Sequence, residues 1–237
     1  KPVERTDGRV KATGKARYAG DLVAPGMLHG KILRSPLAHA KILNIDTSKA
    51  KKLPGVMGVI TGKDFPGIPF GTRPDTRDQL PFPITKVHHF GEGVAAVAAI
   101  DEDTAEEALD LITVDYEELP VVLTAEDALK PDAPLVNEFS KSNIAYTSDF
   151  IFGNPEACFR EADYIKEEKF SSQRVAVGFI EPHACLAEVD ATGRILLQGS
   201  KQSPYPTWRH MCRALDLPLS KMRLVTPFVG GAFSGKH

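Results

Sequence analysis

The chain has 237 residues, of which 42% are hydrophobic, and its 29 basic and 31 acidic side chains give a formal net charge of -2. This length is enough for one large or two medium domains, and the balanced charge excludes a broad cationic surface for nucleic acid or an anionic membrane.

The three cysteines, Cys158, Cys185 and Cys212, are odd in number and have no C-x-x-C spacing, so neither a disulfide framework nor a zinc site is expected. No apolar run is long enough for a membrane span or a signal peptide, which indicates a soluble, cytoplasmic protein. Because the sequence begins at Lys1 without a methionine and stops after a glycine-rich loop, we expect one or both ends to be truncated or processed.

The first half of the chain alternates strand and helix patterns. Five runs have strand composition: 28–35, 39–46, 56–60, 93–100 and 112–119. We expect the first two to pair with each other across the link at Pro36, and the fourth, "GVAAVAAI", to be buried on both faces. A helix follows the fourth run, and Asp101 or Asp103 caps it. This pattern predicts a compact α/β domain over about residues 9–122.

Two irregular passages interrupt this pattern. The proline-rich stretch 65–83 indicates a long surface loop that is functional or faces a partner. The stretch 128–143 has the prolines and polar residues of a linker.

The second half predicts a helix at 155–163 capped by Asn154, a strand at 164–173, and a hairpin over 178–200 that turns at 191–193. A helix then ends before Pro218, and a strand at 222–229 leads into "GGAFSGKH". A loop at the carboxyl end of a strand is the usual place for a binding site in α/β proteins.

This glycine loop has three interpretations. Glycines let the main chain expose successive N–H groups to an anion or to a metal oxo group. A nucleotide-binding P-loop would need Ser or Thr after Lys236, where this chain has His237. A tight turn without a ligand is the third interpretation, but Phe233 among the glycines favours a pocket wall for a planar substrate.

Six phrases in order carry a family resemblance: "GRVKATGKARYAGDL", "RSPLAHAKILNIDTSKA", "GVMGVITGKDFPG", "VAAVAAIDEDTAEEALDLITVDYEELP", "GSKQSPYPTWRHMCRALDLPLSKMRLV" and "VGGAFSGK". Together they resemble the amino-terminal part of the molybdenum-binding subunit of the xanthine dehydrogenase and aldehyde oxidase family. The resemblance is greatest to the large subunits of nicotinate dehydrogenase and 4-hydroxybenzoyl-CoA reductase. It implies a mixed α+β and α/β fold with a hammerhead domain at 9–122, a linker at 123–135 and the first part of a molybdopterin-binding domain at 136–237.

The resemblance also implies the chemistry. Such a subunit holds molybdenum through molybdopterin, here as the cytosine dinucleotide form, and oxidises or reduces an aromatic, N-heterocyclic or aldehyde substrate with water-derived oxygen. The [2Fe-2S] clusters and the FAD sit on partner domains or subunits. A second molybdopterin-binding polypeptide, or a remainder of the same chain, would be needed for activity.

Specific residues are implied through motif matches. The stretch 200–204 places Gln202 where the family hydrogen-bonds the apical oxo ligand, a task suited to an uncharged amide. The glycine loop assigns cofactor contacts to Gln202, Gly230, Gly231, Ala232, Phe233 and Ser234, with Phe233 also catalytic through its backbone N–H and its ring against the substrate. Ser234 replaces a family glycine, which costs about 1 kcal/mol if φ is positive there. His237 stands where purine-oxidising members carry a substrate-binding glutamate, so it is a substrate-contact candidate and puts purine specificity in doubt.

Other polar residues have plainer interpretations. Glu181 and His183 flank Pro182, and a structural role is favoured over an acid–base pair. His88 and His89 are expected on opposite strand faces and not as joint metal ligands. The alternatives to a molybdenum hydroxylase subunit are a non-catalytic assembly module and, with less support, a P-loop nucleotide-binding protein.

Overall fold

The first sheet is built around strand β5 (Gly93–Ala99), the predicted apolar strand, in a computed structural model that describes residues 2–71 and 77–237. Strands β1 (His29–Arg34) and β3 (Val56–Thr61) flank it on either side, both antiparallel to it. The alanines of β5 are small enough for helix α2 (Glu102–Asp110) to pack closely, and the buried cluster contains Ala50, Val59, Ala95, Val97, Ala99, Ala105, Ala108 and Ile112. Of the two predicted caps, Asp101 is the one whose carboxylate accepts from Thr104 N, at 2.7 Å.

The second sheet has the order β4 (Lys86–Val87), β2 (Ala40–Asp46), β6 (Thr113–Glu118), and it is antiparallel. The predicted pairing of the first two strands is therefore wrong, because β1 and β2 lie in different sheets. Their link is not a tight hairpin turn: Ser35 N donates instead to Glu92 O at 2.8 Å, which takes the chain from one sheet to the other. Long-range contacts, and not proximity in sequence, select the partners of these strands.

The third sheet belongs to the second half of the chain. Strands β7 (Cys185–Val189) and β8 (Ile195–Gly199) form the predicted hairpin, and β8 pairs in parallel with β9 (Met222–Val225). Helix α5 (Pro204–Ala214) crosses between the two parallel strands and begins at a proline, which suits the first helical position. Trp208 Nε1 donates to Met222 O at 2.9 Å and fixes α5 against β9. The candidate site lies at the loop between β8 and α5 and at the loop that follows β9.

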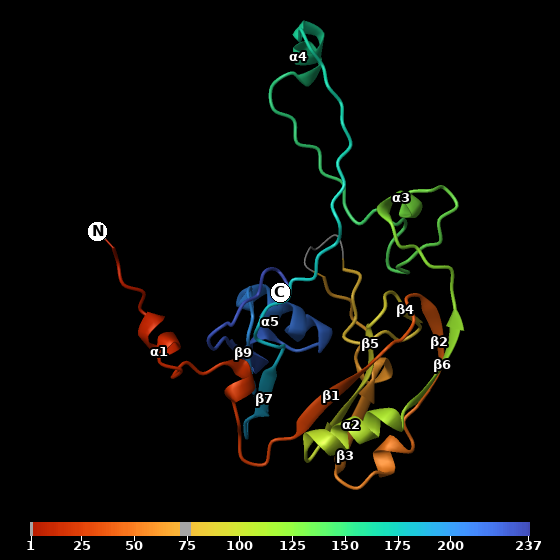
Figure 1. Cartoon of the computed structure of the whole chain (residues 1–237). Coiled ribbons are helices and arrows are strands. Elements are labelled where there is room, and N and C mark those ends of the chain that lie inside the picture. Colours follow the sequence, from red (N-terminus) through yellow and green to blue (C-terminus); the bar gives the residue numbers. More distant parts are fainter. Residues whose placement is uncertain (1, 72–76) are drawn as a thin grey trace.

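Between β6 and β7 the chain forms a long extended segment that carries helix α4 (Pro155–Glu161). Figure 1 shows this segment extending away from the sheets of both halves. Helix α4 lies at its tip and is capped by Asn154, whose side chain accepts from Ala157 N at 3.0 Å. The predicted strand at 164–173 is extended but is not a strand, because it has no neighbouring strand among the described residues.

The remaining short helical segments are α1 (Gly8–Ala12), η1 (Ala19–Asp21), η2 (Ala50–Lys52), η3 (Gly62–Asp64), α3 (Ala125–Ala128) and η4 (Leu219–Lys221). No helix in the described part of the chain is long and apolar enough to cross a membrane.

The passage 65–83 is only partly the surface loop that the sequence predicts. Residues 72–76 lie outside the described residues, while Phe82 is buried and packs edge-on against Phe65 with ring centroids 5.7 Å apart. The passage also reaches the second half of the chain, because Arg213 Nε on α5 donates to Pro69 O at 2.8 Å. This contact holds α5 beside the first half of the molecule.

Candidate functional site

Gln202 lies between the end of β8 and the start of α5, and two hydrogen bonds tie it to the glycine loop. Its backbone N donates to Lys236 O at 2.8 Å, and its side-chain Oε1 accepts from Ser234 N at 2.9 Å. Because the oxygen faces an N–H group, the amide orientation is determined and the Nε2 amino group remains as a donor. The structure thus joins two motifs that are 32 residues apart in sequence.

The glycine loop has an unusual main-chain path. Phe233 and Ser234 have positive φ values of 45° and 66°, and Gly231 has φ 105°. The positive φ at Ser234 is the condition under which the sequence predicts a cost of about 1 kcal/mol. At Gly230 an added Cβ would lie 2.6 Å from the Cβ of Glu181, and at Gly235 it would lie 2.5 Å from the ring of Phe179. These glycines are therefore required for close packing of the loop on residues 179–181.

A buried ion pair holds the loop in place. The side chain of Lys236 is 0% exposed, and its Nζ donates to Glu181 Oε2 at 2.7 Å and to Ser200 Oγ at 3.2 Å. Glu181 Oε2 also accepts from Gly230 N at 2.6 Å and from Ser200 Oγ at 2.7 Å. Burial is the largest single effect on the pKa of Glu181 and raises it, but the hydrogen bonds from Lys236, Gly230 and Ser200 outweigh it and lower the pKa. The network agrees with the structural role favoured for Glu181.

This network also argues against a P-loop. In that motif the lysine must reach a phosphate, whereas Lys236 is enclosed, paired with a carboxylate, and 4.7 Å from the centre of the Phe179 ring. The sequence alone did not predict that Lys236 holds the loop through a buried ion pair. Its position directly after Gly235 was the one local signal that marked it.

Several donors of the site remain available. Gly231 N, Ala232 N, Phe233 N and Gln202 Nε2 have no hydrogen-bond acceptor among the described residues. The Phe233 ring is 73% exposed beside them. Uncharged donors from one loop and from the side-chain amide bonded to it can bind an oxygen-bearing group without adding charge, so the residues present fit the oxo face of a metal-pterin cofactor.

His237 lies at the edge of this site and borders a cavity. Its Nδ1 is 3.2 Å from Ser203 Oγ, next to Gln202. The cavity, about 280 Å³, is mostly apolar and is lined by residues that include Phe65, Phe70, His210 and Met211. His237 thus occupies a position from which it can contact a small molecule in this cavity.

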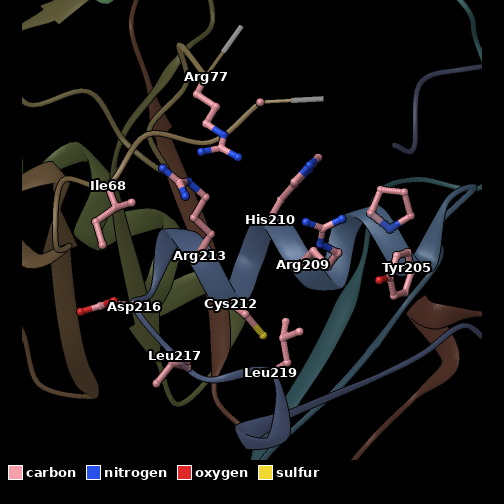
Figure 2. Close-up of a pocket in the computed structure, with 12 residues that line it drawn as sticks. Ile68, Arg77, Tyr205, Arg209, His210, Cys212, Arg213, Asp216, Leu217 and Leu219 are labelled. Atoms are coloured by element: carbon pink, nitrogen blue, oxygen red, sulfur yellow. The ribbon is translucent and has the colours of Figure 1, made fainter. Parts of the chain in front are cut away.

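A second cavity of about 530 Å³ lies along the other side of α5. Figure 2 shows Arg209, His210 and Arg213 projecting from α5 and Arg77 approaching from the opposite side. Burial lowers the pKa of His210, and the positive charges of Arg209 and Arg77 lower it further. Sequence reasoning missed this basic cluster: Arg209, His210 and Arg213 lie together on α5, but only the fold brings the distant Arg77 to them.

The fold and the loop geometry together define a class of protein: a body of two small antiparallel sheets, then a third sheet with helix α5, and a glycine loop whose neutral N–H donors can bind an oxygen-bearing group. Residues 13–120 match the a/b hammerhead domain of aldehyde oxidase and xanthine dehydrogenase, and residues 136–237 match the molybdopterin cofactor-binding domain. The chain therefore belongs to the xanthine dehydrogenase and aldehyde oxidase family, as the sequence predicts, and its fold class is confirmed.

Known relatives cover nearly the whole chain. It is 38% identical to a probable xanthine dehydrogenase subunit of Bacillus subtilis (strain 168), with 98% of this chain and 31% of that protein aligned. It is 35% identical to the "Nicotinate dehydrogenase large molybdopterin subunit" of Eubacterium barkeri, with 98% and 54% aligned. The crystal structure of quinoline 2-oxidoreductase from Pseudomonas putida 86 superimposes with a TM-score of 0.84 at 30% identity, covering 97% of this chain and 30% of that one. The chain thus spans about a third to a half of the length of these relatives.

Proposed function

We propose that this chain forms part of the molybdenum-cofactor-binding subunit of a multi-subunit hydroxylase or dehydrogenase. The observation that carries the proposal is the Gln202–Ser234 hydrogen bond of 2.9 Å, which orients an uncharged amide beside the free N–H groups of the glycine loop. Membership in a family of molybdopterin-binding oxidoreductases supports it.

Each site residue has a defined task in this proposal. Gln202 Nε2 and Phe233 N donate hydrogen bonds to an oxygen of the cofactor, and Gly230, Gly231, Ala232 and Ser234 provide the main-chain path that brings these donors close. When bound, the molybdenum cofactor would supply the redox chemistry that oxidises or reduces the substrate with oxygen from water. The Phe233 ring positions a planar substrate, and His237 contacts it from the neighbouring cavity.

The finer assignments are part of the same proposal. The cofactor is molybdopterin cytosine dinucleotide, the substrate is aromatic, N-heterocyclic or an aldehyde, and electrons pass to [2Fe-2S] clusters and FAD on partner domains or subunits. The hammerhead domain spans 9–122, the linker 123–135 and the first part of the molybdopterin-binding domain 136–237, a division supported by matches over 13–120 and 136–237. A cytoplasmic location is supported by the exposed free thiols of Cys158 and Cys185.

Substitutions in the purified complex test the assigned roles. Gln202→Ala and Phe233→Ala are each expected to lower turnover at least tenfold, because removing one preorganised donor or the ring weakens transition-state stabilisation by about 1.4 kcal/mol or more. Molybdenum content and subunit composition are expected to stay unchanged. Gln198→Ala is the matched control, because that amide lies on β8 and contacts Glu188 instead.

Three outcomes are informative. Normal turnover in both site variants would refute the residue roles. A complex that lacks molybdenum and pterin by elemental analysis and mass spectrometry would refute the cofactor assignment and favour a non-catalytic assembly module. A tenfold loss in Gln198→Ala as well would show that the effect is not specific to Gln202.

A further inference from the structure

Three arginines, Arg77, Arg209 and Arg213, which we call the arginine cluster, line one cavity of about 530 Å³ (Figure 2). None of them forms an ion pair with a carboxylate in the part of the chain that the structure describes. Asp216 lines the same cavity, but Figure 2 shows its side chain directed away from the arginines. Arg209 and Arg213 are four residues apart on α5, a spacing at which like charges repel and destabilise a helix. An anion bound between them would relieve this repulsion.

Two of the guanidinium groups are held in place before any ligand binds. Arg213 Nε donates to Pro69 O at 2.8 Å, which leaves its two Nη groups as donors. Arg209 lies over the ring of Tyr205, 5.9 Å from its centre. The planar fork of a guanidinium group matches the oxygens of a carboxylate or a phosphate, and groups that are already oriented lose less freedom on binding. The cavity therefore has the donors of an anion site.

His210 connects this cavity to the one beside His237. It lines both of them, so the two cavities are neighbours. The cavity beside His237, about 280 Å³ in volume, has the aromatic walls Phe65 and Phe70, and no carboxylate lines it among the described residues. The rings of His210 and Phe70 lie 6.1 Å apart. Burial lowers the pKa of His210, and the charges of two cluster arginines lower it further, which marks the junction as a region of positive potential.

We propose that the arginine cluster binds an anionic group, a carboxylate or a phosphate, of a substrate whose planar part occupies the aromatic cavity beside His237. This inference rests on the proposed function and narrows its substrate class to planar molecules that carry such a group. The volume of about 530 Å³ lies in the range of small-ligand pockets. A neutral substrate would leave the arginines without a counter-charge, so the cluster selects for anions.

Equilibrium dialysis on the purified complex tests this selection with two pairs of probes, benzoate against benzamide and phenyl phosphate against phenol. At least one anion is expected to bind at least tenfold more tightly than its neutral counterpart, and the better anion shows whether the group is a carboxylate or a phosphate. Arg209→Gln/Arg213→Gln is expected to abolish the preference, because Gln keeps a donor but has no charge. Arg194→Gln/Arg223→Gln is the matched control: both arginines are exposed, lie outside the cavity and give the same charge change, so the preference should stay within twofold.

A second variant tests whether one molecule spans both cavities. Phe70→Ala is expected to weaken binding of the aromatic anion at least tenfold, because it removes a wall of the aromatic cavity. Binding of inorganic phosphate or acetate, which reach only the arginines, should stay within twofold. Equal binding of the aromatic anion to Phe70→Ala and to the unmodified complex would overturn the substrate role.

The remaining outcomes separate this inference from the proposed function. No preference for either anion, or the same preference in Arg209→Gln/Arg213→Gln, would overturn the anion site. So would loss of a subunit from that variant with unchanged probe binding, since the arginines would then face an acidic protein partner. A molybdenum-loaded complex without anion preference contradicts this inference alone, whereas arginine-dependent anion binding in a complex without molybdenum contradicts the proposed function alone.

Discussion

At the scale of single residues, the site depends on one enclosed lysine. Lys236 supplies the cation that compensates Glu181, and Glu181 in turn holds Gly230 and Ser200. Without the lysine, a carboxylate of low exposure would remain with no counter-charge, which is far more costly than losing a surface ion pair.

Lys236→Met is therefore expected to lower the free energy of unfolding by about 3 kcal/mol, measured by urea denaturation at pH 7. Lys51→Met, at an exposed helix position, is the control and should change it by less than about 0.5 kcal/mol. The double variant Glu181→Gln/Lys236→Met should recover part of the loss, because no uncompensated charge is left. A loss below about 1 kcal/mol in the single variant would show that the pair does not hold the loop.

At the scale of elements, a histidine joins β4 to the segment after α3. His88 lies just beyond β4, with Nε2 2.7 Å from Glu138 Oε2 and Nδ1 3.1 Å from Glu92 Oε1. Desolvation is the largest single effect and lowers the pKa of His88, but the hydrogen bonds and charges of the two carboxylates outweigh it and raise the pKa to about 9. Desolvation is also the largest effect on Glu138, whose pKa it raises. The hydrogen bond from His88 and the positive charge of His88 outweigh it and bring the pKa of Glu138 down to about 2. His89 contacts a different acceptor, Phe90 O, at 3.0 Å.

These shifts give stability a defined pH dependence. The raised pKa of His88 stabilises the folded state fully below its usual value of 6.5, and this contribution is lost as pH rises through about 9. The lowered pKa of Glu138 stabilises it above the usual 4.5, and this contribution is lost as pH falls toward about 2. Between pH 6 and 10, the free energy of unfolding from urea titrations is expected to fall by about 1–2 kcal/mol more in the unmodified chain than in Glu138→Gln. Parallel curves for the two proteins would contradict the bridging role of His88.

At the scale of the whole molecule, the N-terminal segment connects the two halves. Tyr18 forms a parallel bridge with Phe228, their ring centroids are 6.2 Å apart, and Lys11 Nζ lies 5.3 Å from the centre of the Phe228 ring. The first residues of the hammerhead domain thus lie against Phe228, in the stretch between β9 and the glycine loop. The segment therefore supports a site that lies in the other half of the chain.

Phe228→Ala should release this segment. Asp21 N and Leu22 N, which donate to Tyr18 O at 3.0 Å and Ala19 O at 3.3 Å, are expected to exchange about tenfold faster by mass spectrometry, because about 1.4 kcal/mol of packing is lost. Phe90→Ala is the control, since that ring is 72% exposed. Unchanged exchange in Phe228→Ala would show that the segment is held by other contacts.

Local chemistry allowed much of this protein to be predicted. The apolar run of β5, the cap at Asp101, the hairpin of β7 and β8 and the helix α5 all follow from patterns within about ten residues, where propensity and periodicity act. The family and fold class follow from the order of six motifs, and the match of residues 13–120 and 136–237 to two family domains confirms them. The assignments of Gln202, Phe233 and His237 stay predictions.

Tertiary structure decided the features that depend on distant residues. The sequence determined which runs form strands, but β1 and β2 entered different sheets because each is satisfied by a partner far along the chain. It supplied a strand pattern at 164–173, yet a strand exists only where another strand accepts its hydrogen bonds. It placed Gln202 and Ser234 in separate motifs, and only folding brought them to 2.9 Å and buried Lys236 between Glu181 and Ser200. Periodicity reports which side of an element is apolar, whereas the identity of the surface that covers it is a property of the assembled molecule.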